Sequence, residues 1–204
     1  KSSLALLGET YLAISRNQTV EAIEILRKVR ESFPEDPLSY IFSSYLQTFV
    51  GDFPEALREC DKGLSAIPNN PLLLAFKVDL HFILDQPDEA KQTIDFLLRE
   101  NPQSSEGYER LGFYDRMVTG DSKKAKGAYR KSILLDPLND EASAKLADLL
   151  REEGYMPEAL KLIEDALSIA PWNAMHHYNY GRLLADINKI DKARAEFSKS
   201  LDLD

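Results

Sequence analysis

The chain has few of the residues on which catalysis, metal binding or cross-linking depends. It has one cysteine, three histidines and nine scattered glycines among 204 residues. A single cysteine, Cys60, excludes an internal disulfide, and its place on an apolar helix face predicts a buried thiol. His176 and His177 are neighbours that point about 100° apart on a helix, so they cannot bind one metal together. We therefore expect no metal, no cofactor and no catalytic residues, because no Ser/His/Asp or Cys/His set can be proposed from the spacing.

Long apolar runs are also missing. None approaches the roughly 18 residues that a membrane-spanning helix needs, although 44% of the residues are hydrophobic. The net charge of −9 argues against nucleic acid or an anionic membrane as the main partner. No signal peptide is visible at Lys1. The cytoplasm is slightly preferred to the periplasm as a location, and neither is excluded.

The chain does have a regular period. Five prolines are separated by 34, 34, 35 and 34 residues: Pro34, Pro68, Pro102, Pro137 and Pro171. The best-formed unit, 140–171, reads as two amphipathic helices joined at Gly154, with leucines at i, i+3 and i+4 on one face. The other five prolines fall in expected first turns of helices, where the missing N–H costs nothing.

The spacing and the residues resemble the tetratricopeptide repeat, a helix–turn–helix unit of 34 residues. The fifth unit carries most of the motif: Leu146, Ala147, Leu150, Gly154, Ala159, Ile163, Ala166 and Pro171. This resemblance implies an all-α fold, a right-handed superhelical solenoid of paired helices, over the whole chain and without strands. It also implies a scaffold or adaptor that binds other proteins.

We expect six repeats in a single array. Their ranges are 1–36, 37–70, 71–104, 105–139, 140–173 and 174–204. Their helices are expected at 2–15, 20–32, 37–50, 53–66, 71–84, 87–100, 105–118, 122–135, 140–153, 156–169, 174–187 and 190–202. The first repeat is assigned two extra residues between its helices, and the fourth one extra residue before Gly120. Since the chain stops at a repeat boundary without a polar capping helix, we expect it to be a piece of a longer protein.

In this family the first helices of the repeats line a concave groove. Positions 4, 7, 8 and 11 of each repeat pack, which leaves positions 2, 5, 9, 12 and 13 to face the groove. In the first repeat these positions are Ser2, Ala5, Glu9 and Leu12. Among all the repeats, the expected partner-binding residues are Leu38, Ile41, Tyr45, Phe49, Leu72, Phe82, Phe113, Arg116, Arg151, Tyr178 and Arg182.

The expected groove has an apolar half and a charged half. Repeats two and three present aromatic and aliphatic groups, which often mark an interaction site. Repeats four to six present mixed charge, with Arg116, Arg151 and Arg182 as anchors for a partner carboxylate or carbonyl. Such a groove holds an extended or helical segment of a protein partner. The alternative is that the apolar groups pack between repeats and that the charges pair with their neighbours.

One subclass of the family grips the carboxylate ends of chaperones with Lys at position 5 and Asn at position 9. No three consecutive repeats here fit that clamp, so we do not expect a chaperone tail as the partner. Two other functions stay open. The chain forms a homo-oligomer by stacking uncapped terminal repeats, or it is the substrate-recruiting arm of an enzyme whose catalytic domain lies outside these residues.

Overall fold

The computed structural model describes residues 2–16 and 18–203, and this part of the chain folds into helices without strands. The helices are α1 (Ser3–Ser15), α2 (Thr19–Ser32), α3 (Pro37–Phe49), α4 (Phe53–Ala66), α5 (Pro71–Ile83), α6 (Pro87–Glu100), α7 (Ser105–Met117), α8 (Ser122–Leu135), α9 (Asp140–Glu152), α10 (Met156–Ile169), α11 (Ala174–Asp186) and α12 (Ile190–Leu203). Every expected helix is present, with ends within one residue of the prediction. The all-α prediction is confirmed.

The first helix of every repeat begins at a capping side chain. The caps are Ser2, Asp36, Asn70, Ser104, Asn139 and Asn173, and each accepts a hydrogen bond from a backbone N–H of the first turn. Such a bond satisfies one of the N–H groups that a helix start leaves without a partner. Prolines occupy the first turns of α3, α4, α5, α6 and α10, as expected. The repeat boundaries are therefore set by short polar sequences, often next to proline.

The frame of the first repeat differs from the prediction by two residues. α1 and α2 begin at Ser3 and Thr19, the same separation as between Pro37 and Phe53 in the next repeat. The first repeat therefore has no extra residues, and Ser3 is its position 1. The motif-like Leu7, Gly8 and Tyr11 suggested the wrong frame. In the correct frame, Thr10 takes the buried small position and Tyr11 is left 58% exposed.

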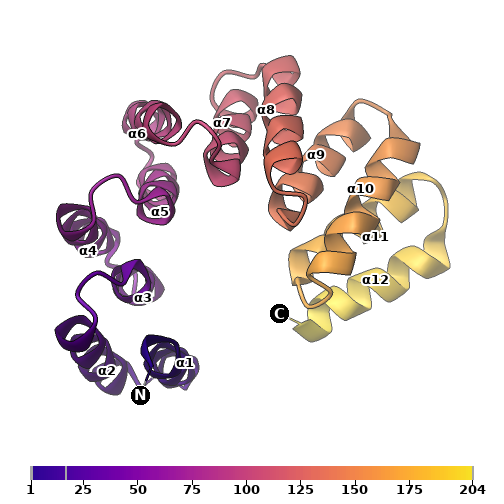
Figure 1. Cartoon of the computed structure of the whole chain (residues 1–204). Helices are drawn as coiled ribbons and strands as arrows, with labels where there is room; N and C mark the ends of the chain where they lie inside the picture. The colour runs from indigo at the N-terminus through magenta and orange to yellow at the C-terminus, as the bar shows by residue number, and fades with distance from the viewer. Residues whose placement is uncertain (1, 17, 204) are drawn as a thin grey trace. The chain divides into compact units, whose positions relative to one another are not determined.

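The chain forms two compact units, Lys1–Pro102 (unit 1) and Gln103–Asp204 (unit 2). Each unit contains three helix pairs, from α1 to α6 and from α7 to α12 (Figure 1). The division falls at the end of the third repeat. Among the described helices, none has the length and apolar character to cross a membrane.

The two helices of a repeat meet where a small residue of the first faces a larger residue of the second. A Cβ atom on Gly112 would lie only 2.6 Å from Cε1 of Tyr129, and one on Gly181 would lie 2.6 Å from Cε1 of Phe197. The equivalent positions of the other repeats hold Thr10 with Leu26, Ser44 with Cys60, Val78 with Ile94, and Ala147 with Ile163, all buried. Small and large residues therefore complement each other at each crossing.

Cys60 belongs to this set of buried residues. Its side chain is fully buried and its Sγ lies 3.2 Å from the carbonyl oxygen of Leu73. Burial, with a smaller contribution from Asp61, raises the pKa of the thiol to about 12. Because the thiolate is the reactive form of cysteine, Cys60 is a packing residue at neutral pH, as predicted.

Substitution of Gly112 by alanine should destabilise the protein. The added methyl group meets the fully buried Tyr129 ring and forces it to move, which costs about 1–3 kcal/mol. The better helix propensity of alanine returns at most about 1 kcal/mol.

The matched control is Gly127, in the second helix of the same repeat, where an added Cβ atom would meet no other atom within 4 Å. Gly127→Ala should therefore raise stability by up to about 1 kcal/mol. Urea denaturation should show a lower free energy of unfolding for Gly112→Ala and a higher one for Gly127→Ala. Equal effects would contradict the close approach of the two helices at Gly112.

Candidate protein-binding surfaces

The first helices of unit 1 carry large apolar side chains that face solvent. Six of those at positions 2, 9 and 13 of the repeats are exposed: Leu4, Tyr11, Tyr45, Phe49, Leu72 and Ile83. They come from α1, α3 and α5, the three first helices of the unit. Contiguous exposed apolar groups of this kind mark sites of interaction in proteins.

Within this surface lies an apolar cavity of about 350 Å³. Tyr11, Ile41, Phe42, Tyr45 and Phe76 line it. Their side chains belong to positions 5, 6 and 9 of three successive first helices, so the cavity lies across all three. The volume is in the range of protein ligand sites, which bury apolar groups among aromatic walls. We call this the apolar cavity of unit 1.

The predicted residues of the apolar half are divided by this geometry. Ile41 and Tyr45 line the cavity, while Phe49 and Leu72 are exposed beside it. Leu38 is half-buried against the core that contains Leu7 and Leu26. Phe82 is also half-buried.

Three lining residues were not predicted from the sequence. Tyr11 was lost through the error of frame in the first repeat, and the predicted Ser2, Ala5, Glu9 and Leu12 are replaced by Leu4, Leu7, Tyr11 and Ile14 at the corresponding positions. Phe42 and Phe76 stand at position 6, which the predicted stripe left out. The spacings 11–45 and 42–76 are both 34 residues, a signal that pairs each aromatic residue with its equivalent in the next repeat.

Position 5 does not face the groove in every repeat, which corrects the predicted stripe. Ala75, Glu109 and Ala144 are at most 3% exposed. Glu109 places a carboxylate in this buried position, and it forms ion pairs with Arg110 at 2.6 Å and with Lys145 of α9. Ala75 packs in a cluster with Leu97 of α6, and Glu109 is covered by Lys145 of the next repeat.

The first helices of unit 2 carry an ion-pair network centred on Asp148. Its carboxylate accepts hydrogen bonds from Arg116 at 2.8 Å, Arg182 at 3.0 Å and Arg151 at 3.2 Å. These arginines come from α7, α11 and α9. Arg116 also pairs with Glu152 at 2.7 Å, and Arg151 with Asp186 at 2.8 Å. The three predicted arginine anchors are therefore already paired within unit 2.

The charge state of Asp148 follows from this network. Burial by itself raises the pKa of the carboxyl group, but hydrogen bonds and charge from Arg116, with Arg182 and Arg151, outweigh it. The pKa of Asp148 therefore lies below its ordinary value. Asp148 therefore links three successive first helices electrostatically. Its removal would leave the charges of the three arginines without their shared partner.

The predicted aromatic residues of unit 2 lie under cations. The Lys145 ammonium is 5.4 Å from the ring centroid of Phe113. The Arg182 guanidinium is 5.7 Å from the ring centroid of Tyr178, whose ring also lies 5.7 Å from that of Phe197. Cation–π contacts of this kind stabilise surface aromatics. The first helices of unit 2 thus present an ionic surface, in contrast to the apolar cavity of unit 1.

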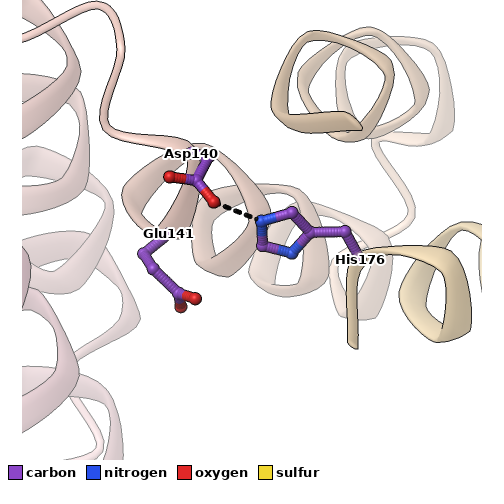
Figure 2. A group of neighbouring side chains, drawn as sticks. All are labelled: Asp140, Glu141 and His176. Carbon is purple, nitrogen blue, oxygen red and sulfur yellow. Dashed lines mark hydrogen bonds and ion pairs between the residues drawn. The ribbon is translucent and has the colours of Figure 1, made fainter. Parts of the chain in front are cut away.

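One cluster with metal-ligand chemistry lies at the start of α9 and α11. Ligand atoms of Asp140, Glu141 and His176 lie within 4.8 Å of one another. Local spacing relates His176 only to His177. Asp140 and Glu141 belong to the preceding repeat, so they were not predicted as partners of His176. Figure 2 shows the His176 ring directed at Asp140, where Nε2 and Oδ2 are 2.7 Å apart.

This cluster has the geometry of a contact between repeats. A histidine that binds metal usually donates its other ring N–H to an acceptor, but Nδ1 of His176 is buried without a hydrogen-bond partner. His176 is 1% exposed, so a ring in this position is held mainly by packing and by Asp140. We assign the cluster no metal and interpret the His176–Asp140 hydrogen bond as a link between α9 and α11.

Comparison with known proteins identifies the repeat. A family model described as tetratricopeptide repeat matches residues 113–174, and a second one of the same description matches residues 177–204. The chain is 36% identical over 78 residues to "Tetratricopeptide repeat protein 37" of Xenopus laevis, a match that covers 37% of the chain. It is 30% identical over 112 residues to the "Hsp70-Hsp90 organizing protein" of Triticum aestivum, a match that covers 53% of the chain. The matches span only 5% and 18% of the lengths of these relatives.

Solved structures share the fold. A thermophilic tetratricopeptide repeat protein of Thermus thermophilus aligns with a TM-score of 0.71 at 17% identity, over 90% of this chain and 100% of its own. The paired helices at a 34-residue period and these matches show that the chain belongs to the tetratricopeptide repeat proteins, whose helical solenoids serve as protein-interaction scaffolds.

Proposed function

We propose that the first helices of unit 1 bind a segment of a protein partner, which inserts an apolar side chain into the apolar cavity. The observation that carries this proposal is the cavity itself, about 350 Å³ in volume and lined by Tyr11, Ile41, Phe42, Tyr45 and Phe76. Burial of a leucine or phenylalanine side chain there is favourable by about 1.5–3 kcal/mol. A hot spot of this size anchors an interface.

Comparison among the repeats supports this proposal. Position 9 holds an aromatic residue in three repeats and a charged residue in the other three: Tyr11, Tyr45 and Phe113 against Asp79, Asp148 and Arg182. The repeat therefore folds with a charged residue at this position. Since folding does not demand an aromatic residue there, the two exposed tyrosines are available for binding.

Unit 2, taken by itself, offers polar contacts to a protein partner in this proposal. Arg116, Arg151 and Arg182 are paired with carboxylates, but a guanidinium has five N–H donors and each pair uses only part of them. Remaining donors bind carbonyl oxygens of a partner segment. A partner carboxylate is less suited, since Asp148, Glu152 and Asp186 already occupy the same three cations.

The wheat relative is named for the chaperones that it organises, but we do not extend that partner to this chain. A chaperone clamp of the kind found in the family needs Lys at position 5 and Asn at position 9. In the corrected frame, unit 1 has Leu7, Ile41 and Ala75 at position 5, and these are apolar. The residues of unit 1 fit an apolar segment better than a carboxylate tail.

A second candidate function is self-assembly, and one observation favours it. Leu12 is 50% exposed, although the leucines at the equivalent position of four other repeats are at most 2% exposed: Leu46, Leu80, Leu149 and Leu183. Leu201 on α12 is 79% exposed. A second copy that stacks α1 against α12 would bury both leucines.

The groove proposal predicts that Tyr11→Asp/Tyr45→Asp weakens the binding of apolar peptides. A phage library of random dodecapeptides is panned on the full chain, and the selected peptides are measured by calorimetry. We expect apolar consensus residues and affinities at least about tenfold weaker for the variant, since loss of a hot spot exceeds about 1.4 kcal/mol. Peptides that bind the variant as well as the wild type would contradict the proposal.

The matched control is Tyr155→Asp, which also replaces an exposed tyrosine but lies in the turn before α10. It should leave peptide affinity unchanged. Melting temperatures of Tyr11→Asp/Tyr45→Asp should stay close to the wild-type value, because Asp79 shows that the position accepts aspartate. A large fall in melting temperature would make the tyrosines part of the core.

Asp148→Asn should destabilise the protein by about 2 kcal/mol, since it leaves three arginines without their shared anion. The folded pKa of Asp148 is lowered, so the carboxylate contributes stability above the unfolded pKa of about 3.9 and loses it as pH falls through the folded value. Urea denaturation should show a constant difference from the wild type down to about pH 4, and a shrinking one below. Asp165→Asn, an exposed carboxylate on α10, is the control. A variant as stable as the wild type at pH 7 would contradict the network.

Self-assembly predicts a molar mass that rises with concentration and a Leu12→Glu variant that stays monomeric. Sedimentation velocity over a wide range of concentration tests both. A wild-type chain that remains a monomer throughout excludes stacking of terminal repeats as its function.

A further inference from the structure

An exposed apolar edge lies in unit 2, at the turns between repeats and at the helix ends beside them. It consists of Leu134, Leu138, Trp172 and Met175, which are 74%, 69%, 70% and 61% exposed. Leu138 and Trp172 stand in the turns before α9 and α11, each directly after a proline that ends a repeat. We call these four residues the edge patch.

Two contacts place these turns on the same edge of the unit. Asn173, next to Trp172, donates from Nδ2 to Glu141 Oε1 at 3.4 Å. His176 and Asp140 are joined at 2.7 Å, as Figure 2 shows. The start of α9, which follows Leu138, therefore adjoins the turn that carries Trp172.

The turns themselves do not require apolar residues here. The equivalent position of the other three inter-repeat turns holds Glu35, Gln103 and Asn69, of which Asn69 alone has a positive φ of 62°. The turn at Glu35 has the same backbone hydrogen bond as the turns at Leu138 and Trp172, from the capping residue to the carbonyl three residues earlier. All five turns end in a side chain that caps the next helix, so the turn forms equally well with a polar residue. Leucine and tryptophan at 138 and 172 thus have no structural cause in the repeat, and most of each side chain is in solvent. Tryptophan is among the residues most enriched at binding hot spots, together with tyrosine and arginine.

The charge around the edge patch is mainly negative, although the Lys145 ammonium lies 3.9 Å from a carboxylate oxygen of Glu141. Residues 134–141 and 165–175 include four acidic residues and neither lysine nor arginine: Asp136, Asp140, Glu141 and Asp165. Glu141 and Asp165 are exposed. The nearest basic residue before the patch, Lys131, lies with its ammonium 6.0 Å from the ring centroid of Tyr108. An anionic membrane is repelled by such a surface, whereas a cationic protein segment is attracted.

We propose that the edge patch is a second protein-binding surface, which takes a segment with lysine or arginine beside an apolar residue. The apolar residue packs on Leu138 and Met175, and the cation binds between the Trp172 ring and the Glu141 carboxylate. Tryptophan is the best cation–π acceptor among the side chains. This surface is independent of the apolar cavity of unit 1, whose five lining residues include no carboxylate.

The test uses the full chain and its single tryptophan. A phage library of random dodecapeptides is panned on the wild type and counter-panned on Leu138→Asn/Trp172→Gln, in which the turns carry the residues found at 69 and 103. Synthetic copies of the peptides that survive are titrated while Trp172 fluorescence is recorded. Since the indole is 70% exposed in the free chain, bound peptide should shift its emission to shorter wavelength.

We expect a consensus with lysine or arginine next to an apolar residue. Affinity should fall at least about tenfold in Glu141→Gln and in Leu138→Asn, a loss of about 1.4 kcal/mol or more. It should be unchanged in Tyr11→Asp/Tyr45→Asp, which separates this surface from the groove. Raising the salt concentration should weaken binding, because the charges are exposed.

An acidic or uncharged consensus would overturn the proposal, as would the absence of any peptide that depends on the edge patch. So would an emission shift produced by phosphatidylserine vesicles in place of peptide, because it would make the edge a lipid-binding surface. Melting curves of Leu138→Asn/Trp172→Gln should match the wild type, since polar residues occupy the same turn position elsewhere. A variant with a lowered melting temperature would show that the patch belongs to the fold instead.

Discussion

The close crossing of the two helices in each repeat is the contact on which the rest of the structure depends. A repeat cannot bury its apolar face alone, so the pair must approach closely before neighbours can stack on it. The combined size of two side chains at the crossing decides that approach: glycine allows a ring in Gly112–Tyr129 and Gly181–Phe197, whereas Val78 and Ala147 face isoleucine. Because the two residues compensate, each repeat keeps its geometry while its sequence differs, and the positions outside the crossing are left free to vary.

That freedom explains why the groove-facing sides of the two units differ so much on the same backbone. Unit 1 uses tyrosine, phenylalanine and leucine and leaves the apolar cavity between its first helices. Unit 2 uses aspartate and arginine, and Asp148 alone is bonded to arginines of three helices. Desolvated ion pairs add specificity of register rather than much net stability. The ionic side therefore links its three first helices through Asp148, whereas no charged residue lines the cavity of the apolar side.

The helices were almost fully predictable, because their starts are marked by local signals: a capping residue such as Asn139 and a proline such as Pro157 act within a few residues. The exposed surface of the helices was less predictable from the sequence. The frame of the first repeat depends on whether Tyr11 or Thr10 is buried. Only the packing of α2 against α1 determines which of the two residues is buried. Burial of Glu109 depends on Lys145, 36 residues away, and the His176–Asp140 bond spans the same separation. Period and polarity predict which residues lie on a helix, but the approach of the next repeat determines which of them stay in solvent.

In a chain of repeats, equivalent positions can be compared with one another. This comparison is the most useful one for assigning function. Where all copies agree in size or polarity, as at the crossing, folding is sufficient to explain the residue. Where some copies hold a polar residue without disturbing the turn or helix, an exposed aromatic residue in another copy has no structural cause. Tyr45 differs in this way from Asp79, and Trp172 differs from Gln103. Both differences leave apolar surface in water at a cost of roughly 25 cal/mol per Å², and neither is compensated by packing in the unit that carries it. The arginines around Asp148 have a different status, because their partners lie within the chain and the charge balance of unit 2 is sufficient to explain them.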